Sequence, residues 1–142
     1  MTTRAQISKN ASNEDDQTEL MRAALDGRTE TVKAMLASGA DVNAKNAEGR
    51  TALMFAVTNM HTETVNALFE READVNIQAN DGCTALLLAA SSGDNGIVQT
   101  LLSKGADVTG EFTETGKTAL MVAKEKGYTD IIRLLQAAGA KR

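Results

Sequence analysis

The sequence predicts an all-α solenoid of stacked helix-turn-helix units, with projecting turns between the units that resemble β-hairpins. Two repeated segments and the composition predict it. A Gly-Ala-Asp-Val-Asn-like segment recurs every 33 residues, with its aspartates at Asp41, Asp74 and Asp107. A Thr-x-Leu-Met-like segment keeps the same phase, with its threonines at Thr18, Thr51, Thr84 and Thr118. Such a period is typical of units that bury their apolar faces only against their neighbours. The chain is 42% apolar but only 3% aromatic, which suits thin layers of closely packed helices.

The repeated segments divide the chain into four units, placed at residues 15–47, 48–80, 81–114 and 115–142. Residues 1–14 are polar, with Ile7 as their one sizeable apolar residue, and are expected to form a disordered N-terminal tail. Each unit is predicted to contain a helix, a tight loop, a second helix and a long turn.

The second unit illustrates the pattern. Thr51 is the expected N-cap of its first helix, because a threonine hydroxyl can accept a hydrogen bond from an early backbone N–H. A second helix is expected to open at Thr62 and Glu63, where an acidic residue in the first turn favours helix formation. Apolar residues at helical spacing mark the buried side of the second helices: Val32, Met35 and Leu36; Val65, Leu68 and Phe69; Val98, Leu101 and Leu102; and Ile131 or Ile132 with Leu134 and Leu135.

Glycines are expected to adopt positive φ between the two helices of a unit and after its second helix, but the second unit has Met60 and Glu72 at these two positions. A positive φ at a residue other than glycine costs on the order of 1 kcal/mol. Replacing either residue by glycine is therefore predicted to stabilise the protein.

The end units differ from the middle units at two positions of the first helix. In the first unit, Arg22 stands where the other units have apolar residues. In the last unit, Lys124 stands where the earlier units have apolar residues. A terminal unit has one face without a neighbour, so polar residues there are typical of caps. The pattern predicts four repeats and no more.

The chain resembles the ankyrin repeat family from about Asp15 to Ala140. The best match is Gly-Cys-Thr-Ala-Leu-Leu-Leu-Ala-Ala-Ser-Ser-Gly at residues 82–93, followed by Leu-Leu-Ser-Lys-Gly-Ala-Asp-Val at residues 101–108. Two features of the family pattern are missing. The chain has no proline, and Met21, Met54, Leu87 and Met121 replace the histidine of the first helix.

The single histidine and the single cysteine give little support to catalysis or metal binding. The resemblance places His61 at a loop position where histidine is structural, and Cys83 in the projecting turn, where a surface location is expected. A structural zinc site needs four ligands, and nucleophilic triads would have to use His61. No catalytic residue, cofactor or metal is predicted, and the protein is not expected to be an enzyme.

Charge and hydropathy also exclude several classes of partner. The net charge is −4 and no Lys/Arg stripe is present, so nucleic acid is not an expected partner. No apolar run approaches the roughly 20 residues of a membrane span, and the first residues lack the apolar region of a secretory signal. A cytoplasmic, monomeric protein is expected.

The resemblance implies a non-enzymatic module that binds a partner protein through a concave surface of turn tips and first helices. Matching to the family pattern places the contact residues at Lys45, Glu48, Arg50, Thr58, Asn59, Asn80, Asp81, Cys83, Ser91, Ser92, Glu114, Lys117, Glu125 and Lys126. The alternative is an engineered or self-associating repeat scaffold without a native small-molecule activity.

The last projecting turn carries one extra residue and an aromatic side chain. Eleven positions separate Asp107 from Thr118, whereas ten separate Asp74 from Thr84. Phe112 lies in this turn and is added to the expected contact residues, because an exposed aromatic on a loop is a common interface anchor. The opposing interpretation is that Phe112 folds back onto the fourth unit.

Overall fold

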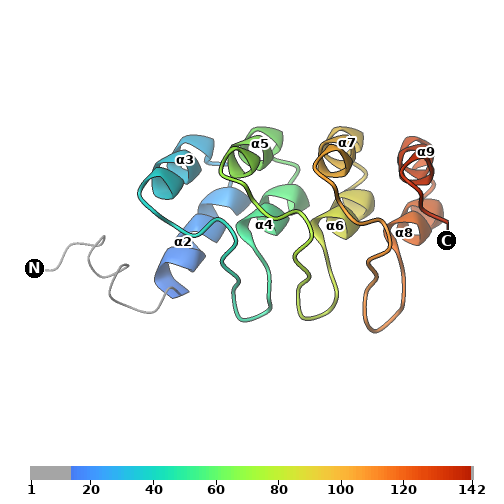
Figure 1. Ribbon diagram of the computed structural model, residues 1–142, viewed down its shortest axis with the longest axis horizontal. Helices are drawn as coiled ribbons and strands as arrows, with labels where there is room; N and C mark the ends of the chain where they lie inside the picture. The colour runs from blue at the N-terminus through green and yellow to red at the C-terminus, as the bar shows by residue number, and fades with distance from the viewer. Residues whose placement is uncertain (1–13, 142) are drawn as a thin grey trace, which may run out of the picture.

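Within residues 14–141, which the computed structural model describes, four helix pairs stand side by side in a row (Figure 1). The first helices of the pairs are α2 (Glu14–Leu25), α4 (Ala52–Thr58), α6 (Ala85–Ser92) and α8 (Ala119–Lys126). The second helices are α3 (Thr29–Ala37), α5 (Thr62–Glu70), α7 (Asn95–Ser103) and α9 (Thr129–Ala137). The predicted all-α solenoid is confirmed. The predicted tail lies outside the described residues except for Glu14, which begins α2.

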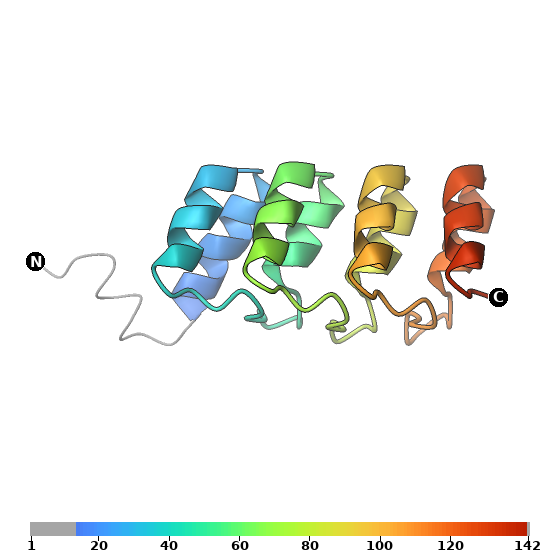
Figure 2. The same cartoon turned by 45° about the horizontal axis from the view of Figure 1, so that its top comes forward.

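The two sets of helices form two layers that run the length of the molecule. Each first helix packs against the first helix of the next pair, and the second helices form a parallel row (Figures 1 and 2). One buried leucine from each first helix lies in the core: Leu20, Leu53, Leu86 and Leu120. The core therefore continues from pair to pair instead of closing around a centre.

The second helices bury the apolar stripes that their spacing predicts. Val65 and Leu68 of α5 are fully buried, whereas Phe69 is half-buried at the edge of the stripe. In the last unit, where the spacing allowed either Ile131 or Ile132 on the buried side, Ile131 is fully buried and Ile132 is only partly buried.

Three first helices begin at the threonines that the sequence marks. The Oγ1 atoms of Thr51, Thr84 and Thr118 accept hydrogen bonds from the backbone N–H three residues later, at 3.4, 3.2 and 3.3 Å. All three threonines are buried. Burial of these capping threonines is tolerated because each hydroxyl oxygen has a hydrogen-bond partner.

The two positive-φ positions expected in the second unit are confirmed, with φ of 57° at Met60 and 63° at Glu72. Glu72 makes the same backbone hydrogen bonds as the glycines at its position. Its N–H donates to Phe69 O at 2.9 Å, and the next N–H donates to Leu68 O at 3.1 Å. The geometry after the second helix is thus kept without glycine.

The recurring aspartates form turns and the neighbouring asparagines join one repeat to the next. Asp74 Oδ1 accepts from the N–H of Asn76 at 2.9 Å, and Asp41 and Asp107 make the equivalent bond. Asn43 Oδ1 accepts from Asp74 N–H at 2.7 Å, and Asn76 Oδ1 accepts from Asp107 N–H at 2.8 Å. These two inter-repeat bonds are called the asparagine rungs.

The projecting turns are narrow loops, here called fingers one, two and three (residues 46–50, 79–83 and 112–117). Each is closed at its base by a backbone hydrogen bond of 2.8 to 3.0 Å, from Asn46 N–H to Arg50 O, from Ala79 N–H to Cys83 O, and from Phe112 N–H to Lys117 O. Neighbouring fingers are also joined, since Asn80 N–H donates to Glu48 O and Thr113 N–H donates to Asp81 O, each at 2.9 Å. An antiparallel bridge pairs Glu111 with Thr118 below finger three. The hairpin-like turns are confirmed, and the extra residue lies within finger three.

The polar residues that mark the end units are both exposed, Arg22 on α2 and Lys124 on α8. Val57 and Ala90, which occupy the Lys124 position in the middle units, are fully buried. No helix in residues 14–141 is long and apolar enough to cross a membrane.

Candidate protein-interaction surface

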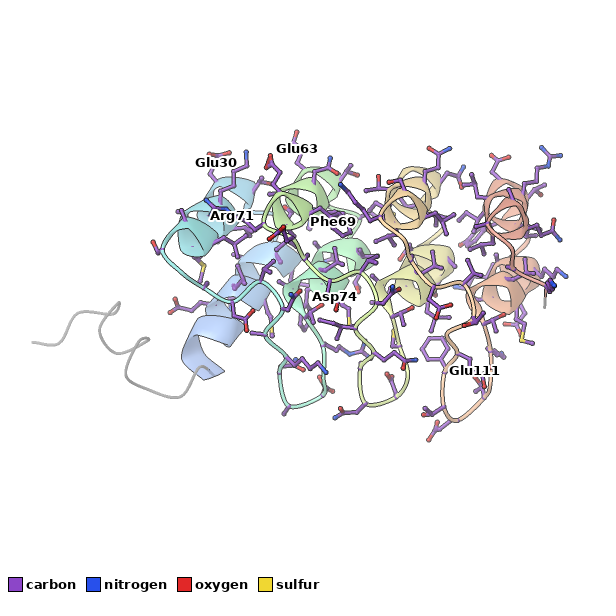
Figure 3. The ribbon with its side chains drawn as sticks, viewed as in Figure 1. Glu30, Glu63, Phe69, Arg71, Asp74 and Glu111 are labelled. Carbon is purple, nitrogen blue, oxygen red and sulfur yellow. The ribbon has the colours of Figure 1, made fainter. Side chains whose placement is uncertain are left out.

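The first helices and the fingers present one continuous surface, here called the inner face. The second helices form the opposite side, where Figure 3 shows Glu30 and Glu63 pointing away from the stack. Backbone hydrogen bonds fix the fingers to one another, so the side chains on the inner face are held at regular intervals.

Most of the sequence-predicted contact residues lie at the surface. The exposed ones are Lys45, Glu48, Thr58, Asn59, Asn80, Asp81, Glu114, Glu125 and Lys126. Arg50, Ser91, Ser92 and Lys117 are half-buried. Their binding role stays a prediction.

Two ion pairs tie predicted contact residues to each other. Arg50 of finger one contacts Asp81 of finger two, with 3.1 Å between Nη2 and Oδ2. Lys117 Nζ lies 2.9 Å from Glu125 Oε2 on α8. Both pairs are partly exposed, so each contributes about 1 kcal/mol or less to stability. They also position the four side chains.

Other predicted contact residues bond to the backbone of a neighbouring repeat. Asn59 Nδ2 donates to Leu25 O at 2.9 Å, and Lys126 Nζ donates to Ser91 O at 3.1 Å. Asn80 Nδ2 donates to Ala47 O at 3.0 Å. These three side chains help to hold adjacent repeats together as well as facing the solvent.

The expectation that Cys83 lies at the surface is wrong. Its side chain is buried, with 1% of its surface exposed, and its Sγ contacts Thr84 O at 3.7 Å. Burial raises the pKa of the Cys83 thiol, and the nearby Arg50 guanidinium opposes this only in part. A buried, protonated thiol can neither contact a partner nor act as a nucleophile without local opening.

Phe112 folds back onto the protein instead of projecting as an exposed anchor. Its ring is half-buried and packs against the core. Its backbone N–H closes finger three at the position that Asn46 and Ala79 hold in the other fingers. The half-buried ring therefore agrees with the fold-back interpretation and is not a fully exposed anchor, and its role in partner binding stays a prediction.

His61 is a structural loop residue, as the resemblance implies. Its Nε2 lies 2.8 Å from Leu25 O of the preceding repeat. Its ring covers Gly27, where an added Cβ would meet Nδ1 at 2.6 Å. Among the residues that the structure describes, no group of three or more His, Cys, Asp and Glu side chains gathers as metal ligands would.

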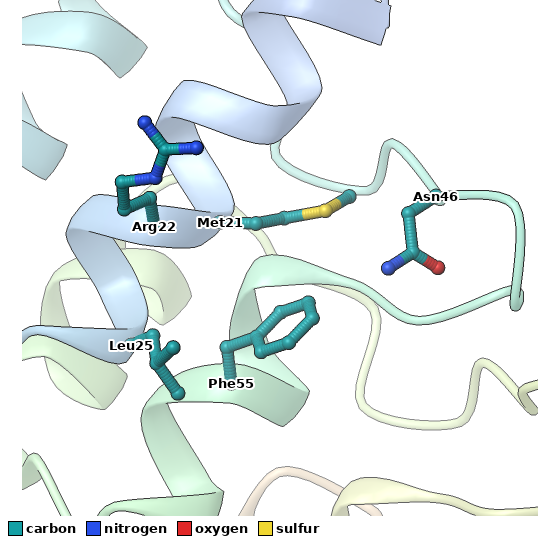
Figure 4. Close-up of a pocket in the computed structure, with 5 residues that line it drawn as sticks. All are labelled: Met21, Arg22, Leu25, Asn46 and Phe55. Atoms are coloured by element: carbon teal, nitrogen blue, oxygen red, sulfur yellow. The ribbon is translucent and has the colours of Figure 1, made fainter.

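The sequence reasoning missed a hollow of about 200 Å³ on the inner face. Figure 4 shows the five residues that line it, which come from α2, finger one and α4: Met21, Arg22, Leu25, Asn46 and Phe55. One signal was present. Leu25 occupies a position where the other units carry polar residues, namely Thr58, Ser91 and Glu125.

Stacked helix pairs whose neighbouring fingers are joined by backbone hydrogen bonds define a helical repeat protein. A family model described as ankyrin repeats (3 copies) matches residues 3–79 and 72–141. These ranges cover nearly the whole sequence, and the chain belongs to the ankyrin repeat family. Members of this family are generally non-enzymatic modules for protein–protein interaction. A search of curated proteins finds no match to the chain.

Proposed function

We propose that the protein binds a partner protein through its inner face and acts by this contact, without catalysis. The observation that carries the proposal is the fixed spacing of exposed side chains along the joined fingers and first helices. Rigid presentation favours binding because little conformational freedom is lost on association.

The chemistry of the inner face favours a reversible contact. Its exposed residues carry both signs of charge, such as Lys45 and Glu114, and polar groups such as Thr58. Half-buried Phe55 and Leu88 add apolar area in the first-helix row. A mixed surface of this kind resembles non-obligate interfaces more than the apolar interfaces of permanent complexes.

The experiment uses variants that change the inner face without breaking a contact in the scaffold. Reversing Arg50 and Lys117 is unsuitable, since both residues form ion pairs. Lys45 and Glu114 are exposed on the finger side and belong to no ion pair within the described residues, so Lys45→Glu with Glu114→Lys is the test variant. The matched control on the second helices is Glu70→Lys with Arg133→Glu, which also leaves the net charge unchanged.

Each protein is immobilised and used to capture partners from extracts of its native host, with quantification by mass spectrometry. The test variant is expected to retain about a tenth or less of a wild-type partner, whereas the control retains it fully. Circular dichroism melts of all three proteins should agree within about 2 °C, because surface substitutions change stability little. Equal capture by both variants, or loss only with the control, would refute binding by the inner face.

A further inference from the structure

The hollow between the first two repeats combines an apolar floor with hydrogen-bond donors. Met21 and Leu25 of α2 and Phe55 of α4 supply the apolar surface (Figure 4). Its volume of about 200 Å³ is sufficient for one apolar side chain, since a cavity of roughly 150 Å³ can hold a benzene molecule.

Leu25 makes this site different from the equivalent places along the stack. It is half-buried, and the residues one, two and three repeats later are Thr58, Ser91 and Glu125. The other units thus show that the fold tolerates polar residues at this position. An aliphatic side chain left half-exposed here is available to an apolar ligand group.

Asn46 directs a donor toward the hollow. Its Oδ1 accepts from the N–H groups of Glu48 and Arg50 inside finger one, at 2.9 and 3.0 Å. These bonds fix the amide plane, and Figure 4 shows the amide nitrogen on the side of Met21 and Phe55. An amide nitrogen is a donor only, so it can donate to an acceptor on the occupant.

Arg22 adds a positive charge at the rim. It is exposed and is one of the residues that line the hollow, and its guanidinium points away from the Phe55 ring toward solvent (Figure 4). No ion pair of Arg22 is found among the described residues, and none of the five lining residues is acidic. Both polar lining groups therefore offer donors, which complement a carboxylate.

From this geometry we infer that the hollow is the anchor point for a linear segment of a partner protein that presents one apolar side chain next to an aspartate or glutamate. The apolar side chain lies on Met21, Leu25 and Phe55, its backbone carbonyl accepts from Asn46, and the carboxylate lies beside Arg22. This inference rests on the proposed function and specifies the chemistry of the partner.

The test selects peptides on the immobilised full-length protein from a phage-displayed random dodecapeptide library. The expected consensus has Leu, Met, Ile or Phe with an acidic residue within two positions. Selected peptides are then labelled with a fluorophore, and their Kd values for each protein are measured by anisotropy.

Arg22→Glu and Leu25→Glu are each expected to raise Kd by about tenfold or more. Both variants should fold, because Arg22 is exposed and the position of Leu25 holds glutamate in the fourth unit. Arg22→Lys should retain most of the affinity, and the control Arg133→Glu should leave it unchanged. In NMR titrations, the methyl signals of Met21 and Leu25 should shift on peptide addition.

Several outcomes would overturn the inference. One is an enriched set without acidic residues, another is no enriched peptide at all, and a third is a set whose Kd is unchanged by Arg22→Glu and Leu25→Glu. If Lys45→Glu with Glu114→Lys instead raises the Kd of these peptides, the inner face still binds and the proposed function stands. If neither pair of changes alters their Kd, the peptides bind elsewhere and the inference fails, whereas the proposed function is decided by the capture experiment. A dimer in light scattering that Leu25→Glu dissociates would assign the hollow to a second copy of the chain, against the inference.

Discussion

Glu72 adopts a backbone conformation that glycine adopts at much lower cost, so Glu72→Gly should stabilise the protein. Its φ is 63°, and its backbone hydrogen bonds match those made by Gly105 one repeat later, where φ is 89°. The Glu72 side chain is exposed, and no ion pair or hydrogen bond of it is found among the described residues. The substitution therefore removes strain while losing almost no contact.

The size of the effect follows from two opposing terms. Relief of the left-handed conformation contributes about 1–2 kcal/mol, and the greater freedom of glycine in the unfolded chain removes about 0.4–1 kcal/mol. The net gain is about 0.5–1 kcal/mol, which corresponds to a rise in Tm of about 2–4 °C for a chain of this size.

Urea titration and thermal melts followed by circular dichroism measure this gain. Gly105→Ala is the matched reverse change, because an added Cβ there meets no atom within 4 Å and only the backbone strain is tested. It should lower stability by about 1 kcal/mol. A lower Tm for Glu72→Gly, or effects of the same sign for both substitutions, would refute the argument from φ.

Three further predictions concern single residues. Met60→Gly should raise the free energy of unfolding by about 0.5–1 kcal/mol in urea titrations, since Met60 has φ of 57° and is 51% exposed; a loss would mean that its side chain packs more than its exposure indicates. Thr109→Asn should add a third asparagine rung, in which the new side chain accepts from the N–H of Lys141, and this should stabilise α9 by about 0.5–1 kcal/mol. Amide hydrogen exchange in α9 should then become slower, and unchanged exchange would contradict the prediction. Cys83 should react with iodoacetamide at pH 8 about 100-fold or more slowly in the folded protein than in concentrated urea, because burial shields the thiol and raises its pKa; equal rates would place the thiol at the surface.

The periodic parts of the fold could be predicted because each repeat supplies an independent copy of the same signal. Thr51, Thr84 and Thr118 cap helices at equal intervals, and the missing glycines revealed the strained φ values at Met60 and Glu72. Such local backbone requirements can be predicted because glycine favours positive φ and threonine favours the N-cap position.

Burial in the fingers was harder to predict because side-chain length matters there. Cys83 shares its position with Arg50 and Lys117, whose long side chains reach the solvent from the same backbone site while a short thiol cannot. The sequence places Phe112 in the projecting turn without fixing its place there, whereas the backbone pairing aligns it with Asn46 and the buried Ala79.

The hollow on the inner face could not be found from spacing alone, since it joins residues from α2, finger one and α4. Asn46 and Phe55 are unremarkable in sequence, and their proximity depends on how finger one lies against two helices.

The asparagine rungs also have a consequence for how the molecule opens. Asn43 and Asn76 each clamp one turn to the next, whereas the Thr109 hydroxyl turns back to Asp107 at 2.6 Å. These rungs hold the second repeat on both sides, the first and third repeats on one side and the fourth repeat on neither, so local unfolding should start from the ends. A peptide bound in the hollow would contact both α2 and α4 and so hold the first repeat to the second. Its binding should then slow the local unfolding of the first repeat.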